Sequence, residues 1–115
     1  MATLTWTPVD SHGSLFSRGK NDYYAILVRG SPEKRPKDCI IELYVTDKEM
    51  TLSEIKYNAE HKKIELLSRQ IVLGNLLPAT SIDEAVEEMK DTAERREHEN
   101  IGASLSTDYT SKYNK

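Results

Sequence analysis

Residues 23–30 form the most strand-like segment of the chain, because they contain apolar side chains on both alternating faces. One face comprises Tyr24, Ile26 and Val28, and the other comprises Tyr23, Ala25 and Leu27. Gly30 and Pro32 follow directly and end the pattern. We therefore predict a strand here whose two faces both need cover.

Residues 39–46 form a second strand pattern with one clear inner face. This face consists of Ile41, Leu43 and Val45, while Tyr44 stands on the opposite side. Residues 3–9 and 14–22 predict two shorter strands: the first stops at Pro8, and the second turns at Gly19, Asn21 and Asp22.

Residues 51–73 fit two different structures. As a hairpin, Ile55 and Tyr57 share one strand face, and a polar turn leads to a returning strand. As a helix, Thr51 and Glu54 have the spacing of a capping box. A helical stripe through the whole segment would include Lys63, so the pattern favours the hairpin.

Residues 81–102 predict an amphipathic helix. Ser81 and Glu84 have capping-box spacing, and Gly102 is a typical helix end. The apolar positions at helical spacing are Ile82, Ala85, Val86, Met89 and Ala93. Together these segments predict an α+β domain over residues 1–102, with a small antiparallel sheet of four to six strands and the C-terminal helix packed on one face. Residues 103–115 are too polar to fold alone and are predicted to be a tail.

Composition and charge narrow the class of protein. The 115 residues carry a net charge of −3, with a mildly basic front and an acidic back. No segment is apolar for the length that a membrane span needs. Residues 1–10 lack the basic region followed by an apolar stretch that is typical of a signal peptide, so we do not expect one there. The single cysteine, Cys39, cannot form an internal disulfide, so we expect a reducing compartment, the cytoplasm.

The chain offers few groups for catalysis, metal binding or cofactor binding. His12, His61 and His98 lie in polar segments typical of solvated surface. No zinc-ligand spacing and no glycine-rich phosphate loop is present, and no cofactor is expected. Glu94 and His98 have the spacing of an exposed helical pair, and Cys39 begins an apolar strand as a buried thiol would. We therefore expect a protein that is not an enzyme.

Residues 29–37 are the best candidate in the sequence for an anion-binding site. The loop contains Arg29, Lys34, Arg35 and Lys37, diluted by Glu33 and without an aromatic neighbour for a base to stack on. This loop supports an alternative function, the binding of a small anionic ligand or nucleic acid.

The leading hypothesis rests on the sheet. One narrow helix covers only one face of a sheet, which would leave an aromatic face of Tyr23, Leu27, Tyr44 and Trp6 exposed to a partner. The alternative is that residues 51–73 form a second helix and bury this face as well. The hypothesis describes an adaptor, subunit or inhibitor that docks on another protein. By analogy of size and charge alone, such domains occur among phage- and mobile-element-encoded inhibitors.

Overall fold

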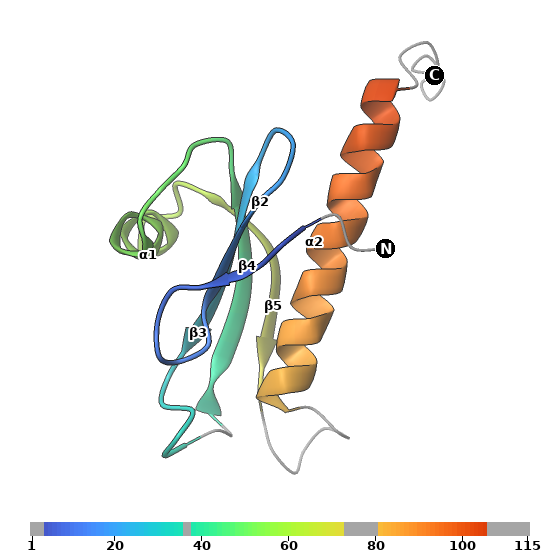
Figure 1. Ribbon diagram of the computed structural model, residues 1–115. Coiled ribbons are helices and arrows are strands. Elements are labelled where there is room, and N and C mark those ends of the chain that lie inside the picture. The colour runs from blue at the N-terminus through green and yellow to red at the C-terminus, as the bar shows by residue number, and fades with distance from the viewer. Residues whose placement is uncertain (1–3, 36–37, 73–80, 106–115) are drawn as a thin grey trace.

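The computed structural model describes residues 4–35, 38–72 and 81–105, with side chains up to Glu99 in the last range. Its elements are β1 (Thr7–Pro8), β2 (Leu15–Arg18), β3 (Tyr23–Arg29), β4 (Ile40–Thr46), α1 (Leu52–Glu60), β5 (Glu65–Ile71) and α2 (Ile82–Leu105). The strands form one antiparallel sheet in the order β1-β2-β3-β4-β5. The sheet stands between the two helices, with α1 on one face and α2 on the other (Figure 1). The predicted α+β class, the antiparallel sheet and the packed C-terminal helix are confirmed.

The larger core lies between the sheet and α2. The face of β3 with Tyr24, Ile26 and Val28 and the predicted inner face of β4 both point into it, and the predicted stripe of α2 covers them. Met89, Ala85 and Ala93 have no exposed surface, so the helix packs closely on the sheet through small side chains around one methionine. Beyond the end of β5, the main-chain N–H of Val72 donates a hydrogen bond to the carbonyl oxygen of Cys39 at 2.9 Å, so the pairing of β5 with the β4 side of the chain continues there.

The smaller core lies between the sheet and α1. It consists of Ala25, Leu27, Tyr44 and Ile55, with half-buried apolar side chains around them. Ile55 is the one buried side chain of α1, so this helix covers the sheet through a single deep contact. The sheet therefore has apolar side chains buried on both faces, as the composition of β3 requires.

The predicted hairpin over residues 51–73 is half wrong. Its first half is the helix α1, which has the complete capping box: Glu54 N donates to Thr51 Oγ1 at 3.2 Å, and Thr51 N donates to Glu54 Oε1 at 2.8 Å. The helix ends at Glu60, and Lys62 turns the chain with a φ of 56° before β5 returns as a strand. The helix is short enough that Lys63 lies outside it, so the lysine does not interrupt its apolar face.

The ends of two other elements also differ from prediction. The predicted strand over residues 3–9 is reduced to the two residues of β1, which include Pro8, a residue that an edge strand tolerates. The helix α2 continues through Gly102 to Leu105 and extends past the end of the sheet (Figure 1). Of the predicted tail, residues 106–115 lie outside the described residues.

Candidate functional site: a groove on the α1 face of the sheet

A groove with a volume of about 390 Å³ opens on the α1 side of the sheet. The elements that form it are far apart in sequence: β2, β3 and β4 supply the floor, and Glu49, Met50, Ile55 and Ile64 also line it. Thr5 and Thr7 complete the lining from the N-terminal part of the chain. The large apolar side chains of the lining are Phe16, Tyr23, Tyr44, Met50, Ile55 and Ile64.

The register of the strands determines the floor. Directly paired residues of antiparallel strands share a face, so paired residues form rows across the sheet. The two rows of this face that line the groove are Arg18–Tyr23–Thr46 and Phe16–Ala25–Tyr44. The second row is the apolar floor, and the first places a cation and an aromatic ring near the opening.

The lining of the groove is mostly uncharged. Its charged lining residues are Arg18 and Glu49, both exposed at the rim. The guanidinium carbon of Arg18 lies 5.4 Å from the centroid of the Tyr23 ring, within the range of a cation–π contact. Tyr23 itself is half-buried, so part of its ring remains available to a ligand.

A buried ion pair lies beside the groove and supports its floor. Glu42 is 5% exposed, and its carboxylate accepts a hydrogen bond from Arg29 Nε at 2.6 Å and pairs with Arg69 Nε at 3.4 Å. Burial, together with the negative charge of Glu42, raises the pKa of Tyr44. The Tyr44 hydroxyl therefore stays protonated and anchored among these charged groups.

The predicted aromatic face is only partly present. Tyr23 lines the groove, but Leu27 is 1% and Tyr44 6% exposed, because α1 covers them. Their predicted exposure was wrong, since the sequence pattern did not reveal the second helix. Trp6 belongs to the other face, where it packs against the α2 core. Tyr44 still forms part of the groove floor, so two of the four residues meet at one site.

The predicted basic loop does not gather its cations into one site. Arg29 is engaged by the buried Glu42, and Arg35 Nη2 pairs with Asp38 Oδ2 at 2.5 Å. Lys34 is exposed, and Lys37 lies outside the described residues. Burial alone would lower the pKa of Arg29, but the hydrogen bond and the charge of Glu42, together with Tyr44, outweigh this and raise it. A phosphate would have to compete with two carboxylates for the arginines of this loop.

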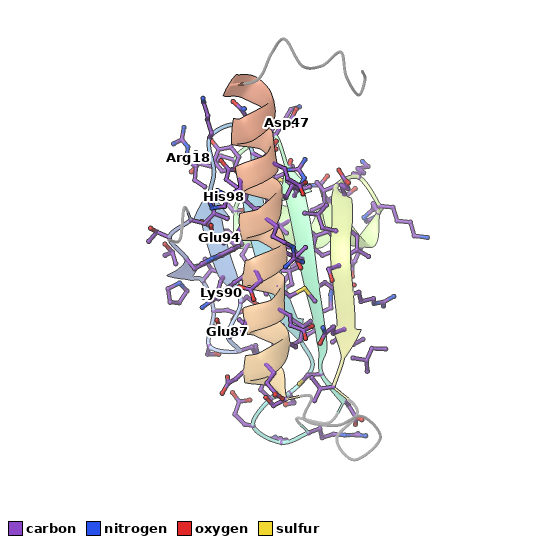
Figure 2. All side chains as sticks on the ribbon, turned by 90° about the vertical axis from the view of Figure 1, so that its right-hand side faces the viewer. Arg18, Asp47, Glu87, Lys90, Glu94 and His98 are labelled. Carbon is purple, nitrogen blue, oxygen red and sulfur yellow. The ribbon has the colours of Figure 1, made fainter. Side chains whose placement is uncertain are left out.

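The residues considered for catalysis or metal binding lie in surroundings that are typical of structural residues. Cys39 is fully buried, and desolvation raises the pKa of its thiol, as expected of an inert cysteine. His98 Nε2 lies 3.9 Å from Glu94 Oε1, which is the predicted helical pair; Figure 2 shows both along α2. Within the described ranges, no three His, Cys, Asp or Glu side chains come together to hold a metal ion.

Sequence reasoning missed a buried carboxylate on the α2 side. Glu97 is 1% exposed, and its oxygens accept from Lys20 N at 2.6 Å and from Tyr24 Oη at 2.9 Å. Arg96 Nη1 donates to Asp22 Oδ2 at 2.8 Å and to Tyr24 Oη at 3.1 Å. This cluster fastens α2 to the β2–β3 turn. The sequence does contain one indication that Glu97 is buried: it lies one helical turn beyond Ala93, on the same face of the helix.

No family model, curated protein sequence or solved structure matches this chain. None of the described helices is long and apolar enough to cross a membrane.

Proposed function

We propose that this protein is a non-enzymatic binding module, an adaptor, subunit or inhibitor, which docks on a partner protein through the groove on the α1 face. The observation that carries the proposal is the groove itself. This concave site combines an apolar floor, a half-buried tyrosine and a polar rim. Ligand sites in proteins typically have this combination and a volume of roughly 300–1,000 Å³.

The chemistry of the lining defines the kind of partner. Phe16, Met50 and Ile64 are half-buried and border the opening, so they offer apolar contact to an incoming side chain. Aromatic and methionine side chains are enriched at the centres of protein interfaces, and charged groups are enriched at their rims. We infer that the partner inserts one or two large apolar side chains, while its polar groups meet Arg18 and Glu49 at the rim.

The single cysteine, which is a buried free thiol, supports a cytoplasmic location for this function. With the groove as the proposed binding site, the four residues of the predicted aromatic face have different roles. Tyr23 keeps the role of a contact residue, Tyr44 becomes part of the floor, and Leu27 and Trp6 become core residues.

The test compares two tyrosines on the α1 side of the molecule. Tyr23→Ala removes a groove residue, and Tyr57→Ala makes the same chemical change at a site outside the groove that is 52% exposed. After capture from a lysate of the native host and identification by mass spectrometry, the partner is purified and its affinity is measured by calorimetry. We expect Tyr23→Ala to weaken binding by about 2 kcal/mol or more, the range of an interface hot spot. Tyr57→Ala should leave affinity unchanged.

A second variant guards against an indirect effect on folding. Met50→Lys places a charge in the apolar lining at a half-buried position, and circular dichroism verifies that the variant is folded. A folded Met50→Lys protein that binds the partner as tightly as the unaltered chain would refute the proposal.

A further inference from the structure

The C-terminal end of α1 carries an exposed stack of two aromatic rings. The centroids of the Tyr57 and His61 rings lie 4.1 Å apart, and the ring planes are inclined by 27°. Both residues are exposed, and Tyr57 is the most exposed large hydrophobic residue of the described chain at 52%. Neither ring belongs to a core cluster.

The orientation of the histidine is fixed by the main chain. His61 Nδ1 lies 2.8 Å from the carbonyl oxygen of Tyr57. A carbonyl oxygen only accepts hydrogen bonds, so Nδ1 must carry a proton and donate it. This leaves Nε2 as the ring atom that can meet a ligand, and it holds the imidazole over the tyrosine. Ordinary helix capping explains the hydrogen bond, but it does not explain why the tyrosine is exposed.

Lysines lie close to the stacked pair, one in space and two in sequence. Lys63 Nζ lies 5.5 Å from the centroid of the Tyr57 ring, and Lys56 and Lys62 are exposed beside it in sequence. The left-handed conformation of Lys62 directs the chain around this corner. Lys63 therefore contacts the aromatic platform directly, Lys56 and Lys62 add exposed positive charge to this part of the chain, and Glu60 is the carboxylate of this helix end.

The positive charge continues into a neighbouring hollow of about 550 Å³. Lys62 lines this hollow together with Arg29 and Arg69, and its carboxylates are Glu42 and Glu60. Because Arg29 and Arg69 share the single charge of Glu42, three cations face two carboxylates and one positive charge remains uncompensated. Arg69 is 55% exposed and can reach an anion outside the hollow.

The opposite side of the molecule repels anions. Residues 82–99 carry eight Asp or Glu against three Lys or Arg; Glu97 is buried, and the other seven acidic residues lie on α2 on the far face of the sheet without being fully buried. In Figure 2 Glu87, Lys90 and Glu94 follow one another along that helix. A polyanion approaching the protein is therefore directed toward the α1 side.

We propose that Tyr57, His61, Lys62 and Lys63 form a binding site for single-stranded nucleic acid. An unpaired base stacks on the exposed rings, while flanking phosphates contact Lys62 and Lys63 and continue toward Arg69. Aromatic platforms within a basic groove are the common means by which proteins hold single strands without reading sequence. This site lies apart from the basic loop, which has cations but no aromatic ring.

The experiment measures fluorescence anisotropy of a short fluorescein-labelled oligothymidylate with the full-length protein over a range of salt concentrations. We expect binding at low salt that weakens as salt increases. Tyr57→Leu should reduce affinity about tenfold or more, since stacking of one base contributes about 1–3 kcal/mol. Lys62→Gln with Lys63→Gln should reduce the slope of log affinity against log salt by up to about 1.4, the value for two phosphate contacts of a single strand.

Matched controls separate this site from general charge and from the proposed protein-binding groove. Lys34→Gln with Arg35→Gln removes the same charge from the basic loop, and Tyr23→Ala removes a tyrosine from the groove; both should leave the oligothymidylate affinity and slope unchanged. Annealing the probe to its complement should weaken binding, because paired bases are not free to stack. Circular dichroism verifies that each variant is folded. Absence of binding at low salt, equal effects of the two double variants, or equal affinity for the duplex would overturn the proposal.

Discussion

Replacement of Glu97 by alanine should be among the most destabilising single changes on α2. The carboxylate is buried and accepts two hydrogen bonds, from the main-chain N–H of Lys20 and from the hydroxyl of Tyr24. Removing it leaves both donors without this acceptor. An unsatisfied buried donor costs about 1–3 kcal/mol, so two of them give a loss of about 2–6 kcal/mol. That is a large part of the roughly 5–15 kcal/mol that stabilises a domain.

The assay is urea unfolding followed by the fluorescence of Trp6, which is the single tryptophan and packs against the α2 core. Glu99→Ala is the matched control, because Glu99 is an exposed glutamate on the same helix and should change stability by less than about 0.5 kcal/mol. A double-mutant cycle with Tyr24→Phe isolates the bond between Tyr24 and Glu97, for which we expect a coupling of about 1–3 kcal/mol. If Glu97→Ala unfolds at the same urea concentration as the unaltered chain, the carboxylate does not fasten α2 as described.

Three further perturbations test other parts of the fold. Met89→Ala should cost about 2–4 kcal/mol in the same unfolding assay, because Met89 is fully buried at the centre of the α2 core; unchanged stability would mean that this stripe does not face the sheet. Thr51→Ala should cost about 1 kcal/mol by removing the acceptor for Glu54 N, and the loss should appear in the helical signal of circular dichroism, with Ser53→Ala as the control for an exposed hydroxyl on the same helix. Burial raises the pKa of Tyr24 from 10.0 to about 12. Because the folded pKa is the higher one, this contribution to stability is complete below pH 10 and is lost as the pH rises toward 12. Spectrophotometric titration of the phenolates should show a tyrosine that titrates near pH 12 and is absent in Tyr24→Phe.

The fold was largely predictable because its strongest elements have local patterns. The alternation in β3 and β4 and the stripe of α2 each depend on neighbours within one element, so the sequence displays them directly. The helix α1 was misjudged because the stripe was followed as far as Lys63, whereas the helix ends at Glu60. Asn58, a poor helix former, is accommodated by donating its side-chain amide to Glu54 O at 2.7 Å.

The candidate sites were less predictable because they are assembled from distant segments. The groove joins Phe16 to Met50 and Ile64, and no spacing in the sequence relates these residues. The exposure of Tyr44 could not be judged without knowing that a helix lies above it. Arg29 pairs with Glu42 because the two residues occupy neighbouring positions across β3 and β4. This ion pair makes Arg29 less available to bind an anion at the basic loop.

The difference in size between the two cores has a consequence for how the protein opens. The α2 core contains most of the buried apolar side chains, whereas α1 is held on the sheet through Ile55 and a few half-buried neighbours. Detaching α1 therefore exposes little apolar surface and requires less free energy than unfolding the whole chain. Main-chain amides of α1 should exchange with deuterium through this smaller opening, while those of β3 and β4 exchange only on global unfolding. Both proposed binding surfaces border α1, so a ligand at either one would slow the same exchange.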